Sequence, residues 1–199
     1  MARQGELFGR SQLGELGQIG AGAIPLLAHQ LEQWQGRLAC HQGPLFANQQ
    51  AAAEQISLFG SRGDTAEQQA EHFNPLNLQP QPLSFWRWPA APQHGCALYF
   101  VADRPAGLSQ PLLLYVGETG RADQRWKGEH DCKAYLAAYG EALLKANLGC
   151  QLSIRFWLDV PSAIGARRAL EQALIRRWLP PFNKETRSRW ATPFQADPA

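Results

Sequence analysis

The sequence predicts an α+β fold in which a small three-stranded sheet, mixed or antiparallel, is flanked by helices. Two observations support this prediction. Apolar segments at 96–102, 112–118 and 151–160 have the composition of strands, and the last of them alternates apolar with polar residues. Amphipathic, helix-like stretches separate the second strand from the third and follow the third. A sheet covered by helices is the architecture that this order of elements favours.

The first 92 residues differ from the rest and are predicted to form a helical, partly irregular region. One helix is expected at 24–38, where Ile24, Leu27, Leu31, Trp34 and Leu38 recur at spacings of three and four. Residues 43–63 are small and polar without clear periodicity, and prolines disfavour regular structure between 74 and 95. We therefore expect a boundary near Pro92, a domain at 93–190 and a tail at 191–199.

The elements after this boundary follow from local patterns. The first two strands are expected to pair as an antiparallel hairpin, because a turn-rich loop at 102–111 joins them. A mostly helical stretch at 130–147 leads to the third strand. The last helix is predicted at 162–179, because an apolar face recurs there every four residues and Pro180 follows. That face is made by Leu170, Leu174 and Trp178.

Composition narrows the classes of function. The formal net charge is only +2, yet 13 Lys or Arg stand against 7 Asp or Glu between 121 and 189. This local excess favours a phosphate-bearing partner, although it is also typical of a solvated surface.

The four cysteines are widely spaced, which argues against a zinc site and against disulfides, and favours a location in the reducing cytoplasm. We expect no membrane association, because neither a signal peptide nor a run of about 20 apolar residues is present.

Side chains able to do chemistry follow the predicted hairpin. Tyr99 and Tyr115 come from its two strands, so a matched register places both phenols on one face of the sheet. Gly117 ends the second strand, Arg125 follows this glycine by eight residues, and His130 follows by thirteen. Each residue alone has an ordinary explanation, since strand tyrosines usually pack in a core and isolated charges are usually solvated.

Two further polar residues belong to the end of the domain. Glu171 lies in the last predicted helix, and Asn183 follows it by twelve residues, just after two prolines. A structural interpretation is open here too: Glu171 has the spacing for surface ion pairs with neighbouring arginines, and Asn183 suits a turn cap. These arginines are Arg167, Arg168 and Arg176. The order and spacing of the whole set indicate chemistry more strongly than any member.

This set resembles the GIY-YIG nuclease superfamily over residues 95–185. Ala97-Leu98-Tyr99 matches the family's first triplet without its leading glycine and isoleucine, and Tyr115-Val116-Gly117 matches the second. Arg125 has the spacing of the family's catalytic arginine, and Glu171 and Asn183 are separated much as in the excision-repair incision subunit. The loop between the triplets is longer than usual. His130 lies five residues after Arg125, where many relatives have a histidine or tyrosine at four, a position that Glu129 occupies here.

The resemblance implies a metal-dependent endonuclease that hydrolyses phosphodiester bonds in DNA during repair, recombination or mobile-element movement; RNA stays open. Glu171 would bind Mg²⁺ or Mn²⁺, since Mg²⁺ often takes only one or two carboxylates. Arg125 would stabilise charge on the phosphate, and Tyr99, Tyr115 and His130 would orient or deprotonate water. Gly117 and Asn183 would support the site. The alternative is a noncatalytic nucleic-acid-binding or adaptor protein that keeps the nuclease fold.

A second motif lies in the N-terminal region. The stretch QISLF at 55–59 resembles the short peptide by which bacterial repair and replication proteins bind the DNA sliding clamp. Leu58 and Phe59 would serve as apolar anchors and Gln55 would supply directional hydrogen bonds. The opposing interpretation is that these apolar side chains pack on the domain. The clamp is therefore a second predicted partner.

Overall fold

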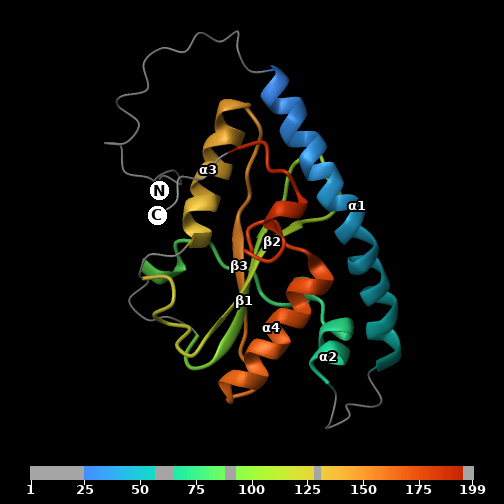
Figure 1. Ribbon diagram of the computed structural model, residues 1–199, viewed down its shortest axis with the longest axis vertical. Coiled ribbons are helices and arrows are strands. Elements are labelled where there is room, and N and C mark those ends of the chain that lie inside the picture. The colour runs from blue at the N-terminus through green and yellow to red at the C-terminus, as the bar shows by residue number, and fades with distance from the viewer. Residues whose placement is uncertain (1–24, 57–64, 88–92, 128–130, 195–199) are drawn as a thin grey trace.

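The computed structural model describes residues 25–56, 65–87, 93–127 and 131–194, and it confirms the predicted α+β class. Figure 1 shows the arrangement of its helices and strands. In chain order these are α1 (Pro25–Ile56), α2 (Ala66–His72), η1 (Pro75–Asn77), η2 (Phe85–Arg87), β1 (Ala97–Asp103), β2 (Leu112–Thr119), α3 (Asp131–Lys145), β3 (Ser153–Trp157), α4 (Ile164–Trp178) and η3 (Arg187–Arg189), where η marks a short 3₁₀ helix.

The sheet has the order β2-β1-β3, and both pairings are antiparallel. The predicted hairpin is therefore confirmed, and the choice between a mixed and an antiparallel sheet is decided for the antiparallel one. Every residue of the central strand β1 is buried. This follows from its composition, because ALYFVA supplies apolar side chains to both faces, as a strand covered on two sides requires.

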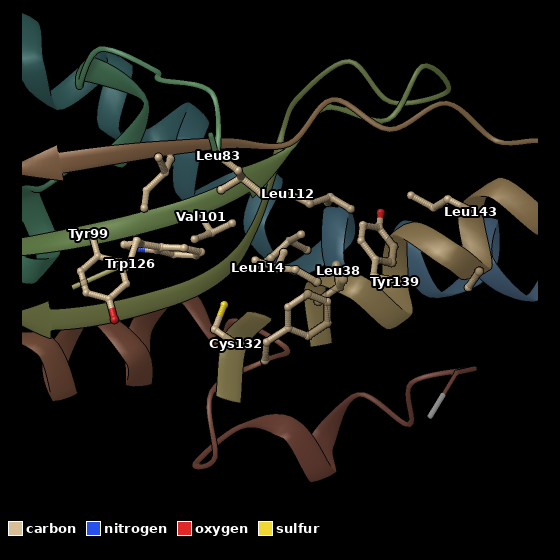
Figure 2. Close-up of a cluster of buried hydrophobic side chains, with 14 of the residues drawn as sticks. Leu38, Leu83, Tyr99, Val101, Leu112, Leu114, Trp126, Cys132, Tyr139 and Leu143 are labelled. Atoms are coloured by element: carbon tan, nitrogen blue, oxygen red, sulfur yellow. The ribbon is translucent and has the colours of Figure 1, made fainter. Parts of the chain in front are cut away.

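One face of the sheet forms the larger apolar cluster with α1 and α3. Figure 2 shows Tyr99 and Val101 of β1 beside Leu112 and Leu114 of β2, with Leu38 of α1 and Tyr139 and Leu143 of α3 packed near them. The residues of α3 that face this cluster recur at helical spacing and include Cys132, Leu136, Tyr139 and Leu143. The helical pattern predicted for 130–147 is thus explained by burial of one face.

The other face packs on α4 and α2. Leu98 and Phe100 of β1 meet Leu170, Leu174 and Trp178 of α4, the apolar face that the sequence predicted. The left-handed conformation of Leu179 ends this helix, and its N–H bonds to the carbonyl of Ile175 at 2.9 Å. Helix α4 therefore packs against the sheet from Leu170 to Trp178.

Helix α1 is longer than expected. It continues from the predicted segment through Pro44 to Ile56, although the sequence after Gly43 lacks an amphipathic pattern. Contacts hold the chain on both sides of the proline: the Gln42 side chain bonds to β2, and Phe46 packs on Trp178 with ring centroids 4.5 Å apart. Tertiary packing here outweighs the local cost of proline.

The described part of the N-terminal region shares the core of the predicted domain. Leu31, Trp34 and Leu38 belong to the first cluster, and Phe46 and Ala70 belong to the second. In Figure 1, α1 runs beside both the sheet and α4. The boundary expected near Pro92 therefore does not separate two hydrophobic cores.

The connector before β1 is more ordered than its prolines suggested. It contains η1 and η2, and Gln81 pairs with Ile154 through two backbone hydrogen bonds of 2.8 Å, which cover part of the free edge of β3. Helix α2 was not predicted, although the Thr65–Gln68 capping box at its start is a sequence signal for a helix N-terminus. All four cysteines are free thiols. None of the helices within the described ranges is long and apolar enough to span a membrane.

Candidate active site

The hairpin register places the two tyrosines on one face of the sheet, as predicted. Tyr99 lies opposite Gly117, and Tyr115 lies opposite Val101, so all four side-chain positions point the same way. The phenol rings stack with centroids 5.9 Å apart. A Cβ atom at Gly117 would overlap the phenol of Tyr99 and the ring of Tyr115. The glycine is therefore required by this pair of rings.

Arg125 completes a chain of hydrogen bonds with these tyrosines. Its Nε donates to the Tyr99 hydroxyl oxygen at 3.1 Å, and the hydroxyl groups of Tyr99 and Tyr115 are hydrogen-bonded to each other. The turn that carries Arg125 is held by a backbone bond to Arg121 at 3.1 Å and by buried Trp126, whose ring meets Tyr99 edge-on at 6.0 Å. Because Arg125 uses only Nε for a side-chain hydrogen bond within the described ranges, its terminal amino groups are open to a ligand.

Glu171 reaches the same region from α4. Its Oε1 accepts a hydrogen bond from the backbone N–H of Glu118, at the end of β2, with a distance of 2.9 Å. Within the described part of the chain, Oε2 has no hydrogen-bond partner and Glu171 forms no ion pair. The expected surface pairing of Glu171 with Arg167, Arg168 or Arg176 is therefore not the arrangement that the structure shows.

These three arginines pair with other carboxylates. Arg167, 3% exposed, donates from Nε to Oε2 of Glu118 at 2.9 Å, and Arg168 lies 3.5 Å from the other oxygen of Glu118. Arg167 also donates to the carbonyls of residues 161 and 162 at 3.1 and 2.9 Å. Arg176 pairs with Glu67 of α2 at 3.0 Å. Arg167 and Arg168 thus neutralise the charge of Glu118, which lies beside Glu171.

Asn183 holds the segment after α4 against β2. Its Oδ1 accepts from the Val116 N–H at 3.0 Å, and its Nδ2 donates to the Val116 carbonyl at 2.7 Å. The neighbouring Phe182 N–H adds a bond to the Leu114 carbonyl at 3.0 Å. Asn183 therefore supports the site by pairing with the strand that carries Tyr115, instead of capping a simple turn.

A cavity of about 340 Å³ connects these residues. Its walls come from Tyr115, Arg125, the Glu171 side of α4 and residues of the segment 182–187, including Asn183. Tyr99 is fully buried and is not part of the wall, so it contacts the cavity only through Arg125 and Tyr115. Four predicted residues from three separate parts of the chain thus line one cavity, and a fifth lies directly behind them.

Burial changes the protonation of this site. It raises the pKa of Glu171 to about 7, with a further contribution from the negative charge of Glu118. Burial also raises the pKa of Tyr99, against the opposing effect of Arg125, and raises the pKa of Tyr115, where Tyr99 adds to the shift. At neutral pH both phenols therefore keep their protons, whereas Glu171 titrates.

Some predicted site residues lie outside the described residues. These are His130, together with Glu129, and Leu58 and Phe59 of the clamp-like stretch. Gln55 falls within α1, but its side chain also lies outside the description. The roles predicted for these positions stay predictions.

Sequence reasoning did not identify several polar residues of this region as members of the site. Glu118 and Arg167 form the ion pair beside Glu171, and Arg187 lines the cavity with the predicted residues. The only available signals were weak: Glu118 ends the strand directly after Gly117, and Arg187 follows Asn183 by four residues. Neither spacing indicates which charged groups meet across the fold.

Comparisons with models of protein families, with curated proteins and with solved structures found no match to this chain.

Proposed function

We propose that this chain is a metal-dependent endonuclease of GIY-YIG type that hydrolyses phosphodiester bonds in DNA. One observation carries the proposal: Tyr115, Arg125 and Glu171, separated along the sequence, line a single cavity of about 340 Å³. A guanidinium, a carboxylate and a phenol can supply the charge stabilisation, metal binding and water orientation that phosphodiester hydrolysis uses.

The residues present fit a magnesium or manganese ion. Glu171 has one carboxylate oxygen bonded to the backbone and one without a partner within the described chain, and Glu185 lines the same cavity. No group of three or more His, Cys, Asp or Glu side chains gathers among the described residues. One or two carboxylates are a sufficient protein contribution for Mg²⁺, which keeps most of its waters. When bound, the ion would supply positive charge at the phosphate and make a water more acidic.

The chain's own residues then have distinct roles. Arg125 binds phosphate oxygens with the terminal nitrogens that Tyr99 leaves open, and the charge-assisted bonds strengthen as negative charge develops. Tyr115 orients water as a hydrogen-bonding group. Its raised pKa favours this role over that of a base, because the phenol keeps its proton at neutral pH. Glu171 is the carboxyl group whose charge changes near pH 7.

A plasmid-nicking assay tests this proposal. Purified protein is incubated with supercoiled DNA and Mg²⁺ or Mn²⁺, and we expect nicked and linear products. Glu171→Gln and Arg125→Ala should each lower the rate at least about 100-fold, the size typical of losing one preorganised charge-stabilising group. Glu141→Gln is the matched control, since this glutamate pairs with Lys145 on the exposed face of α3, and it should nick at the parent rate.

Two results would contradict the proposal. Equal nicking by Glu171→Gln and the parent, with both folded by circular dichroism, would remove Glu171 from the site. Salt-sensitive DNA binding by the parent without cleavage under any metal condition would favour the noncatalytic alternative.

A further inference from the structure

The cavity contains a second arginine that the proposed reaction does not use. Arg187 lies in η3, four residues after Asn183, and lines the cavity together with Arg125. The proposed reaction assigns one guanidinium, that of Arg125, to the cleaved phosphate. The presence of two arginines on the wall of one cavity therefore calls for a second ligand group.

Arg187 is held in place from both its backbone and its side chain. Its N–H bonds to the carbonyl of Asn183 at 2.9 Å, so the residue that fixes β2 also fixes Arg187. The guanidinium lies over the ring of Tyr135 at 4.6 Å, and its NH1 donates to the Tyr135 hydroxyl. Tyr135 in turn stacks on buried Phe182, with centroids 5.6 Å apart. The guanidinium is therefore preorganised rather than a freely moving surface group.

The two arginines are oriented in the same way. Arg125 donates to Tyr99 and Arg187 donates to Tyr135, so each guanidinium is positioned by a phenol hydroxyl. Neither arginine forms an ion pair with a carboxylate within the described ranges. Glu185, the nearest acidic residue in the sequence, accepts instead from Gln172 at 3.0 Å. Both guanidinium groups line a cavity whose carboxylates, Glu171 and Glu185, form no ion pair with them within the described ranges. Such unpaired positive charge favours an anionic ligand.

We infer that Arg187 forms a second phosphate subsite, which binds the phosphate adjacent to the one that is cleaved. The inference rests on the proposed function, which assigns the cleaved phosphate to Arg125. A polynucleotide carries phosphates at regular intervals on both sides of any cleaved bond, and guanidinium binds them in a bidentate fork. The favoured substrate is therefore a nucleic-acid strand, and an isolated diester lacks the group that Arg187 binds.

The first experiment measures binding to a fluorescent 20-base-pair DNA duplex by anisotropy in EDTA. We expect Arg187→Ala to bind roughly tenfold more weakly at 0.1 M salt, because one phosphate contact is lost. The slope of the logarithm of the binding constant against the logarithm of the salt concentration should be about one unit smaller in magnitude. Arg189→Ala is the matched control: it removes the same charge from the same 3₁₀ turn but lies outside the cavity wall. Equal affinities of Arg187→Ala and Arg189→Ala would overturn the inference.

The second experiment separates binding from chemistry by steady-state cleavage. Arg187→Ala should raise KM about tenfold and recover most of its rate at saturating DNA, whereas Arg125→Ala should lose kcat. With bis(p-nitrophenyl) phosphate, which has a single phosphate, Arg187→Ala should match the parent. A loss of kcat at unchanged KM would place Arg187 at the cleaved phosphate and overturn the subsite.

A third variant tests whether misfolding could explain the weaker DNA binding of Arg187→Ala. Tyr135→Phe keeps the ring under the guanidinium but removes the hydroxyl that orients it, so we expect weaker binding in the same direction as Arg187→Ala, with melting behaviour near the parent's. Parent-like affinity in this folded variant would count against the preorganised subsite. If the parent binds DNA through Arg187 but cleaves nothing, the proposed function fails while the subsite stands.

Discussion

At the scale of single residues, the Glu171 carboxyl group has an unusual protonation. Burial raises its pKa from 4.5 to about 7, and nearby Glu118 adds to the shift. A raised pKa means that the folded protein binds this proton more tightly than the unfolded chain does. The associated stability is fully present below about pH 4.5 and is lost as the pH rises through about 7.

This linkage predicts a pH-dependent difference between the parent and Glu171→Gln. In EDTA, the parent's free energy of unfolding should fall by about 1 to 2 kcal/mol more than that of Glu171→Gln between pH 4.5 and pH 8, after allowance for partial solvent screening. Urea titrations at both pH values measure it. Other buried acids, such as Asp103, contribute to both proteins and cancel. Identical falls in the two proteins would show that Glu171 titrates normally.

At the scale of elements, the outer edge of β2 is closed by side chains rather than by another strand. The carboxamide of Gln42 from α1 bonds to both backbone groups of Leu113, at 2.8 and 3.0 Å. Asn183 does the same for Val116, and Glu171 accepts from the next outward N–H. An open edge would invite pairing with other chains. The edge that carries Tyr115 is instead protected and held in position.

Removing either carboxamide should be costly. Gln42→Ala and Asn183→Ala each leave a buried N–H and a buried C=O without partners, so we expect losses of about 2 to 4 kcal/mol in unfolding free energy. Gln30→Ala is the control, because Gln30 is exposed on α1, the helix that carries Gln42. It should change stability by less than about 0.5 kcal/mol. Urea titrations of the three variants and the parent measure these losses in unfolding free energy. Comparable small effects for all three variants would mean that water replaces the carboxamides.

At the scale of the whole molecule, α1 connects the N-terminal region to the segment that carries the site. Trp34 is fully buried and packs on Tyr139 and Phe182, with centroids 5.6 and 6.3 Å apart. Phe182 immediately precedes Asn183, and Tyr135 below Arg187 stacks on it. The cavity therefore depends on a helix that lies more than a hundred residues earlier in the chain.

We predict that Trp34→Ala destabilises the whole protein. Loss of a fully buried tryptophan should cost about 3 to 5 kcal/mol. Leu144→Ala, on a side chain 69% exposed on α3, should have little effect. Thermal unfolding followed by far-UV and near-UV circular dichroism should show one shared transition in each protein. Separate transitions, or a small loss for Trp34→Ala, would indicate that α1 folds independently of the sheet.

Local patterns in the sequence determined the fold class, the hairpin and the face on which both tyrosines lie, because strand alternation and helical spacing report which side of an element is buried. Arg125, Glu171 and Asn183 were singled out by their spacing, through the resemblance to the nuclease superfamily and not through local periodicity. Only the tertiary structure decided that α1 continues past Pro44, that Glu118 pairs with Arg167, and that Arg187 lines the cavity. These features depend on contacts between residues far apart in sequence, and no local periodicity records which distant charges and backbone edges meet.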